Sequence, residues 1–529
     1  MYLARRLASF LLLAALFLTV PLTSNAAGRD YDRDDHRIKH VLLISVDGMH
    51  ALDLTTYVAA HPGSTLAQLS AHGKTYTNAS TSQPSDSYPG LASLVTGGSP
   101  ITTGFWYDVS FNRKLSPNAA TNPILGPNAG PCPSTGGTVV ELDEGADIDL
   151  TQLNGGGGIN PNFLPRDPNN GCQPVFPHQY LRVNTIFEVV KAHGGWTAWT
   201  DKHPAYEWTN GPSGHGVDDF FGPEINSIPV ALPFPGCTPV NFADPIPDDG
   251  WVTDLNNIKC YDSTHVQAIL NQIDGFTHDR SHHAPVPKLF GANFQAVSVG
   301  QKLNGNGYTD VLGTPSAGLA GELDFVDQSL GMMVSELKKK GLFESTLIII
   351  VAKHGQSPID VQKRVGIGGG QPQTLIGPDE AFDISDDGSL IWLTDPSLTP
   401  SVVANLSLPA SQVTLGIQEI FAENSLSNKF NSPLTDERTP DIILKTNTGV
   451  IFTGGSKIAE HGGLNEDDLH VALLLSWPEW KAQQIKTPVS NQQVAPTILK
   501  LLGLDPDQLD AVRKEQITIL PFISRDDDN

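Results

Sequence analysis

One candidate functional group is a carboxylate at the end of an apolar run. Residues 40–46 are rich in leucine and β-branched residues, and the run stops at Asp47 and Gly48. Such a run is typical of a strand buried on both faces, and in open α/β sheets ligands bind beyond the carboxyl ends of the strands. Asp47 is therefore a candidate ligand-binding or catalytic group. The alternative is an aspartate that only caps a helix starting near Met49.

A second candidate group lies just before a helix. Residues 80–90 form a polar loop, and residues 91–97 are predicted to be helical. Ser85, Asp86 and Ser87 lie at the start of this helix, where unpaired backbone N–H groups attract anions. Either serine could act as a nucleophile. The alternative is that one of the three residues is simply an N-cap.

A third candidate group follows another apolar run. Residues 346–352 predict a buried strand, and Lys353, His354 and Gly355 come directly after it. A hydrophobic core alone does not require polar residues and a glycine at the ends of two buried strands. Lys353 could supply positive charge in a site shared with Asp47. The alternative is that Lys353 only forms an ion pair with Asp47.

These groups need a scaffold that brings strand ends together. The pattern of buried strands and amphipathic helices predicts an α/β fold with a mostly parallel central sheet and helices on both faces. Further strands are expected at 288–299, 390–393, 441–444 and 470–476, and helices at 51–60, 66–72, 314–340 and 492–502.

The interval from about 105 to 287 differs from the rest of the chain. It is rich in glycine and proline, and we interpret it as an inserted cap that shapes substrate access. An acidic cluster in it could hold calcium but lacks EF-hand spacing, so a solvated loop is favoured. This cluster contains Glu141, Asp143, Glu144, Asp147 and Asp149. Asp201 and His203 are expected to be surface or capping residues.

All four cysteines also lie in this interval. In an exported chain an even number of cysteines usually indicates disulfides, and four cysteines allow three connectivities. We expect sequential pairing of Cys132 with Cys172 and of Cys237 with Cys260.

The N-terminal segment and the net charge bound the location and the partners. Residues 1–26 have the basic, apolar and small-residue regions of a signal peptide with cleavage after Ala26, which predicts a secreted or periplasmic protein. The apolar core is shorter than the roughly 20 residues of a spanning helix, so no membrane span is expected after cleavage. The net charge of -24 argues against a nucleic-acid-binding surface. It permits a small anionic substrate.

Several motifs together resemble the alkaline phosphatase superfamily, in particular its type I phosphodiesterase and nucleotide pyrophosphatase branch. In chain order they are Val46-Asp47-Gly48, Ser87-Tyr88-Pro89 before Val95-Thr96-Gly97, Lys353-His354-Gly355, Glu460-His461-Gly462 and the closing segment 495–499. The resemblance implies an alkaline-phosphatase-like core and hydrolysis of phosphate esters at a pair of metals, usually zinc. It implies Ser87 as the nucleophile that becomes phosphorylated, Asp47 and His354 as ligands of one metal, and His461 as a ligand of the other.

The chain also departs from the family pattern. Val297 and Gln301 stand where the family has an Asp and a His ligand, and Lys353 stands where it has an Asp ligand. Gly90 replaces an Asn that helps to hold the phosphoryl group. A full two-zinc site is therefore not expected, and the prediction is one divalent metal, in the first place zinc, or none.

Three mechanisms follow from these departures. In the first, Asp47, Ser87 and His354, with or without His461, hold a single metal. In the second, Lys353 is a catalytic residue that replaces a metal, with Asp86 and His461 as candidates for proton transfer. In the third, the site binds a ligand without turning it over. We expect an exported hydrolase of phosphate mono- or diesters, with a silent ligand-binding protein as the alternative.

Overall fold

The computed structural model describes residues 38–120, 132, 136–237 and 250–523. The predicted signal peptide, residues 1–26, lies outside these ranges. Within them, no helix has the length and apolar character that a membrane span needs.

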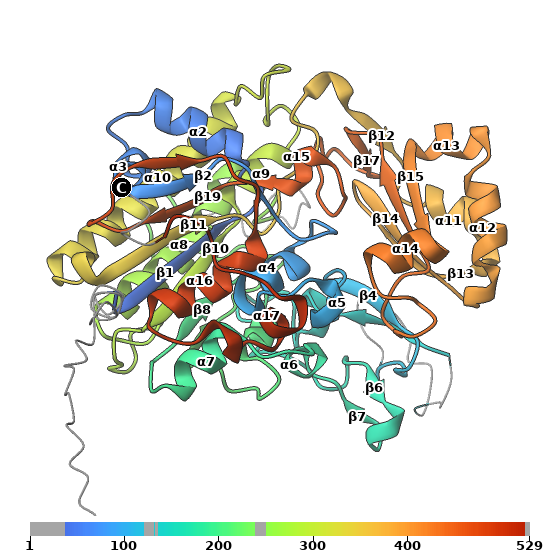
Figure 1. Ribbon diagram of the computed structural model, residues 1–529, viewed down its shortest axis with the longest axis horizontal. Coiled ribbons are helices and arrows are strands. Elements are labelled where there is room, and N and C mark those ends of the chain that lie inside the picture. Colours follow the sequence, from blue (N-terminus) through green and yellow to red (C-terminus); the bar gives the residue numbers. More distant parts are fainter. Residues whose placement is uncertain (1–37, 121–131, 133–135, 238–249, 524–529) are drawn as a thin grey trace, which may run out of the picture.

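The largest sheet has eight strands among the described residues and carries most of the candidate groups (Figure 1). In spatial order the strands are β20 (Gln483–Ile485), β2 (Gly73–Tyr76), β19 (Leu473–Ser476), β11 (Thr346–Val351), β1 (His40–Val46), β10 (Leu289–Phe294), β8 (Ala198–Thr200) and β9 (Asp219–Phe221). Strand β1 is parallel to both β10 and β11, and only β19 pairs antiparallel with its neighbours. The predicted mostly parallel sheet is confirmed.

Helices cover both faces of this sheet. Alternate residues of β1 point to opposite faces, so its apolar side chains pack against helices on both sides. Val41 and Leu43 belong to one hydrophobic cluster, and Leu42 and Ile44 belong to another. The first cluster includes residues of α4 (Ser87–Thr96), α7 (Ile186–Ala192) and α16 (Val494–Leu501). The second includes residues of α2 (Ala51–Ala60), α3 (Thr65–Ala71), α8 (Leu255–Ile273) and α10 (Ala317–Lys339). The predicted α/β class is therefore confirmed on both faces.

The strand predicted at 288–299 is shorter than expected. Strand β10 ends at Phe294, and helix α9 (Ala296–Lys302) follows almost at once. The carboxylate of Asp262 on α8 accepts hydrogen bonds from the backbone N–H groups of Gln295 and Ala296, at 2.8 Å each. These bonds satisfy donors at the helix start, so the chain turns into a helix where the apolar pattern alone predicted more strand.

A second sheet lies apart from the first in Figure 1, where it is drawn in orange. It has the order β13 (Glu380–Ser385), β14 (Gly388–Leu393), β16 (Ile442–Thr446) and β15 (Ile417–Ala422). Beside it are α11 (Gln371–Ile376), α12 (Thr399–Leu406), α13 (Pro409–Leu415) and α14 (Glu423–Lys429). The strands predicted at 390–393 and 441–444 belong to this antiparallel sheet, which the sequence did not separate from the core.

Short elements complete the described chain. Three strands, β18 (His470–Val471), β3 (Ala79–Ser80) and β21 (Val489–Ser490), form a small sheet, and β12 (Val365–Ile367) pairs with β17 (Val450–Phe452). The short helices include α5 (Pro100–Thr103), α15 (Glu466–Leu469) and α17 (Asp510–Glu515).

The interval 105–287 contributes both to the core and to its surroundings. Its strands β8 and β9 extend the central sheet, and its helices α7 and α8 cover the two faces. The hairpins β4 (Val109–Asn112) with β5 (Thr138–Glu141) and β6 (Arg166–Asp167) with β7 (Gln173–Pro174), together with the short helix α6 (Pro177–Tyr180), lie outside that sheet.

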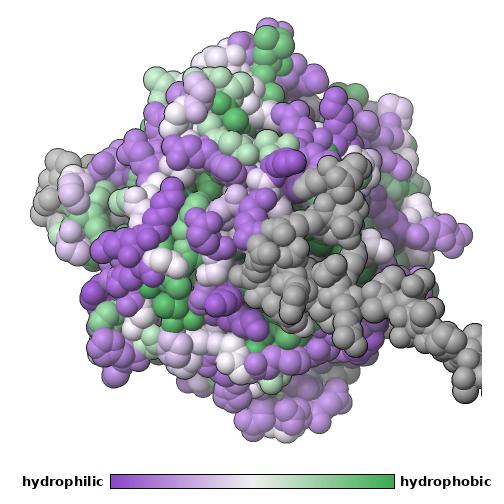
Figure 2. Space-filling view, turned by 60° about the vertical axis from the view of Figure 1, so that its left-hand side comes forward, coloured by the Kyte–Doolittle hydropathy of each residue, from purple (hydrophilic) through white to green (hydrophobic). Residues whose placement is uncertain are grey.

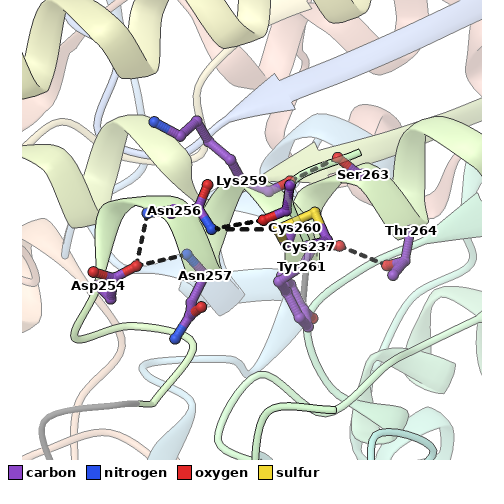
Figure 3. The surroundings of a disulfide bond; sticks show 10 residues. Cys237, Asp254, Asn256, Asn257, Lys259, Cys260, Tyr261, Ser263 and Thr264 are labelled. Carbon is purple, nitrogen blue, oxygen red and sulfur yellow. Dashed lines mark hydrogen bonds between the residues drawn. A yellow bond between two sulfur atoms is a disulfide. The ribbon is translucent and has the colours of Figure 1, made fainter. Parts of the chain in front are cut away.

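Two disulfides hold parts of this interval together. Cys132 pairs with Cys172, and Cys237 pairs with Cys260 near the start of α8. Figure 3 shows the second disulfide, with the first turn of α8 capped by the side chain of Asp254. The predicted sequential pairing is confirmed.

The surface drawn in Figure 2 is mainly hydrophilic, with separate hydrophobic areas between charged and polar residues. Such a distribution is ordinary for a folded protein surface.

Candidate functional site

Asp47 comes directly after β1, and its side chain is fully buried. Its Oδ2 atom accepts hydrogen bonds from Gln295 Nε2 at 2.6 Å and Asn293 Nδ2 at 3.2 Å. Its Oδ1 atom has no hydrogen-bond partner among the described residues. Burial would raise the pKa of Asp47, but the charge of Lys353, together with the nearby His354 side chain, holds it well below its ordinary value. The side chain is therefore an ionised carboxylate with one free oxygen.

Ser87 is the first residue of α4, and Asp86 is its N-cap, with the carboxylate accepting a hydrogen bond from the Tyr88 N–H. The ammonium of Lys202 donates a hydrogen bond to Ser87 Oγ at 2.9 Å. The Ser85 hydroxyl instead donates to the backbone carbonyl of Asp468. The geometry therefore favours Ser87 over Ser85 as the nucleophile.

Gly90 lets α4 approach the end of β11. A Cβ atom at this position would overlap the backbone carbonyl of Lys353. The position therefore admits no asparagine, and the phosphoryl-binding side chain that the family resemblance implies here has no room.

Lys353 pairs with a residue that we expected at the surface. Its Nζ atom lies 2.7 Å and 2.9 Å from the two carboxylate oxygens of Asp201, and both side chains are fully buried. The same ammonium lies 4.3 Å from the centre of the Tyr206 ring, a cation–π contact. The expectation for Asp201 was wrong because strand β8 belongs to the central sheet, so the residue after it is delivered to the interior.

Lys202 was missed by the sequence analysis. Its Nζ atom lies between Ser87 Oγ and Asp47 Oδ2, at 2.9 Å and 3.7 Å. Burial would lower the pKa of Lys202, but Asp47 and Asp108 raise it, so the side chain carries a positive charge. The local signal was weak, because the strand before Lys202 has three residues, Ala198–Thr200, and Asp201 stands between that strand and the lysine.

His354 and His461 lie next to each other, with ring centres 3.7 Å apart. His354 Nε2 lies 3.5 Å from Asp47 Oδ2. Burial lowers the pKa of both histidines, so both are neutral at pH 7. Among the described residues, His354 Nε2 and His461 Nδ1 have no hydrogen-bond partner.

Val297 and Gln301 both lie on α9 and serve structural purposes. Val297 packs in the cluster beneath the sheet. Gln301 Nε2 donates to the Gly48 carbonyl at 2.9 Å, and its Oε1 accepts from Gln356 Nε2 at 2.8 Å. A cavity of about 190 Å³ lies beside Gln301, Tyr308 and Gln356. The side chains on this side of the site do not fit a second metal ion.

The full set of residues does not fit the two-metal arrangement that the resemblance implies. Two ammonium groups, those of Lys202 and Lys353, lie around Asp47 and Asp201 instead. The free atoms on Asp47, His354 and His461 could still bind one cation. A different group has the closer spacing. Among the described residues, Glu144, His203 and Glu224 form a set of three whose possible ligand atoms all lie within 4.8 Å of one another.

Comparison with known proteins agrees with this fold and these motifs. A model of the type I phosphodiesterase / nucleotide pyrophosphatase family matches residues 41–123 and 231–470, more than half of the chain. The residues between these two segments include Asp201, Lys202 and His203. A comparison with curated proteins gave no significant match.

Solved structures support the fold. The murine ectonucleotide pyrophosphatase / phosphodiesterase 5 is 13% identical, with a TM-score of 0.53 and coverage of 88% of this chain and 96% of that one. An inactive variant of the murine protein in complex with AMP has the same identity and TM-score. The similarity confirms the predicted alkaline-phosphatase-like fold.

Proposed function

Because the chain belongs to the type I phosphodiesterase / nucleotide pyrophosphatase family, we propose that it is an exported hydrolase of phosphate mono- or diesters with Ser87 as the nucleophile. One observation carries the proposal: Ser87 Oγ lies at a helix start, 2.9 Å from a charged Lys202 ammonium. A nearby ammonium favours the alkoxide form of serine and offsets charge on phosphoryl oxygens.

In this reaction Ser87 Oγ attacks phosphorus, and the bond from phosphorus to the leaving alcohol breaks. Water then attacks phosphorus in the covalent Ser87 intermediate and releases phosphate when the substrate is a monoester, or a phosphate monoester when the substrate is a diester. The seryl proton needs an acceptor, and neutral His461, with its free Nδ1 atom, is our candidate. Burial and Asp108 raise the pKa of Asp86 well above its ordinary value, so a protonated Asp86 is our candidate donor to the leaving group.

Lys202 and Lys353 together provide the charge of one divalent ion. Lys202 acts directly at Ser87, whereas Lys353 is held by Asp201 and adds to the positive field around Asp47. We therefore propose that hydrolysis uses these ammonium groups. A single zinc ion on Asp47, His354 and His461 is the second candidate, favoured by their free buried atoms.

The location and the substrate class rest on separate observations. The predicted signal peptide and the two disulfides support export. The solved complex of the murine relative with AMP supports nucleotide esters as the first natural substrates to assay.

The experiment that tests the proposal compares two serine variants. Ser87→Ala should reduce hydrolysis of bis-p-nitrophenyl phosphate by about 10³-fold or more, since the covalent route is lost. Ser85→Ala should retain most of the activity. Acid quenching during turnover should trap a p-nitrophenyl phosphoryl group on Ser87, which peptide mass spectrometry detects. Loss of activity in Ser85→Ala alone would place the nucleophile two residues earlier.

A silent ligand-binding protein is the alternative, and the replacement of ligand positions by Val297 and Gln301 favours it. In that case AMP should bind, as calorimetry measures, while no phosphate ester is turned over and no phosphoserine forms.

A further inference from the structure

A second cluster of charged residues lies next to the proposed active site. His203 directly follows Lys202, and its Nδ1 atom lies 2.9 Å and 3.0 Å from the carboxylate oxygens of Glu224. Glu144 completes a set of three side chains whose ligand atoms all lie within 4.8 Å of one another. His203 and Glu224 are buried, whereas Glu144 is partly exposed. The cluster therefore has a buried floor and a side open to solvent.

Asp147 provides an independent indication that this cluster takes a ligand. Its side chain is only 2% exposed, yet both carboxylate oxygens lack a hydrogen-bond partner among the described residues. The polar group that it faces is another carboxylate, that of Glu224. An ionised carboxylate cannot donate a hydrogen bond, so two such groups face each other only with a proton or a cation between them.

These residues were expected to behave differently. The acidic segment was predicted to be a solvated loop, but Glu141, Asp143 and Asp147 are all buried, and His203 lies in the interior instead of at the surface. The reason is the backbone path: Asp147 ends the short helix Glu144–Ala146, and the residue pair Asp147 and Ile159 forms an isolated β-bridge that closes the loop over the side chains.

We propose that Glu144, Asp147, His203 and Glu224 form a binding site for one divalent transition-metal ion. Imidazole suits Zn²⁺, carboxylates suit Mn²⁺, and Ca²⁺ and Mg²⁺ are bound mainly by oxygen ligands. A cluster of one histidine and three carboxylates therefore fits Zn²⁺ or Mn²⁺ better than Ca²⁺ or Mg²⁺. Adjacent ligand atoms about 2.1 Å from one ion lie about 3.0 Å apart in octahedral geometry and about 3.4 Å apart in tetrahedral geometry. The 2.9 Å between His203 Nδ1 and the nearer Glu224 oxygen is close to the octahedral value.

The site would hold the segment that carries Lys202. The backbone N–H of Ile225, next to Glu224, donates to the Lys202 carbonyl at 3.0 Å. The Tyr261 hydroxyl contacts the carbonyls of both Lys202 and Pro223, at 3.2 Å and 2.7 Å. An ion that joins His203 to Glu224 therefore fixes both sides of the loop that presents the Lys202 ammonium. The ion positions this lysine and does not contact the substrate.

The test measures bound metal, so it does not depend on catalytic activity. The full mature chain is treated with chelator, dialysed, and titrated with Zn²⁺ and with Mn²⁺; stoichiometry is measured by plasma mass spectrometry and affinity by competition with a chromogenic chelator. We expect one equivalent of one of these ions. Glu224→Gln and Glu144→Gln should each weaken binding by more than the roughly 10–100-fold typical of changes to groups that only support a ligand.

His178 and Glu207 provide a matched control. They form a similar histidine–carboxylate pair at 2.8 Å but are each about 20% exposed and outside the set of three. Glu207→Gln should leave metal binding unchanged. Because Glu144 is partly exposed, its variant should fold, which circular dichroism checks. Zn²⁺ or Mn²⁺ should also raise the melting temperature of the unmodified chain, and this increase should be lost in Glu144→Gln.

Two results would overturn the proposal. One is the absence of any stoichiometric metal in the folded chain with either ion. The other is bound metal that Asp47→Asn removes while Glu144→Gln and Glu224→Gln retain it, since the ion would then lie at the active site. If only the hydrolase proposal is wrong, the chain will bind metal at this site as expected but will not hydrolyse phosphate esters.

Discussion

The proposed active site has two sides with different origins. Asp47, Ser87 and His354 lie within the segments that the family model matches, whereas Asp201 and Lys202 lie between them. The first side contains the proposed nucleophile and the candidate metal ligands Asp47 and His354, and the second side brings a lysine to Ser87. The difference indicates that a site on this fold can keep its core motifs while a segment outside the family match supplies positive charge.

The largest expected effect comes from removing the contribution of the inserted side. Lys202→Met should lower kcat/KM for bis-p-nitrophenyl phosphate by about 10²–10³-fold, the usual cost of losing one group that stabilises transition-state charge. Steady-state kinetics measures the change. Lys191→Met is the matched control, because Lys191 lies in the same interval but pairs with Asp218 and is 37% exposed. Its activity should stay within about twofold of the unmodified chain.

If Lys202→Met retained full activity while the chelated chain lost it, the charge at Ser87 would come from a metal. In that case His354 and His461 would be essential for hydrolysis, and Lys202 would contribute little.

An effect of intermediate size should distinguish Lys202 from Lys353 through the pH dependence of activity. Burial lowers the pKa of Lys353, whereas Asp47 and Asp108 raise that of Lys202 against the effect of burial. An ammonium is charged only below its pKa, so rising pH removes the charge of Lys353 first. Activity should therefore fall on the alkaline side, beginning below the ordinary lysine pKa of about 10.4, in a pH–rate profile of kcat/KM.

The double variant Lys353→Met, Asp201→Asn is the control for this profile, because it removes both members of the buried pair. Its lower activity should stay level over the same alkaline range, since Lys202 remains charged. An unchanged alkaline decrease in the double variant would assign it to another group.

The sequence identified the candidate residues Asp47, Ser87 and His354, but it did not predict the contribution of Asp201 and Lys202. The apolar runs before Asp47 and Lys353 identify strands that are buried on both faces, and their exits define the site. The run before Lys202 is only a few residues long and lies among glycine- and proline-rich segments, so its place in the central sheet depends on pairing with β10, a partner about 90 residues away. Likewise, the turn into α9 depends on Asp262 from a distant helix, which no local pattern reveals.

The smallest expected effect concerns the contact between the inserted interval and the second-sheet region. Arg182 forms a two-pronged ion pair with Asp436, at 2.7 Å and 2.8 Å. Burial opposes the effect, but Arg182 lowers the pKa of Asp436 to about 2. This pair therefore adds stability above the unfolded-state pKa of about 3.9, and the contribution is lost as the pH falls toward 2. Since Arg182 is 27% exposed, Asp436→Asn should cost about 1–2 kcal/mol at pH 7.

Chemical denaturation at several pH values measures this difference, with Lys114→Met as the control because Lys114 is 67% exposed in its pair with Glu437. The control should change the free energy of unfolding by less than about 0.5 kcal/mol at every pH. The difference between Asp436→Asn and the unmodified chain should shrink between about pH 4 and pH 2. A difference that is constant over this range would mean that Asp436 acts through packing and not through its charge, and that the two regions are held together without an ionic contribution.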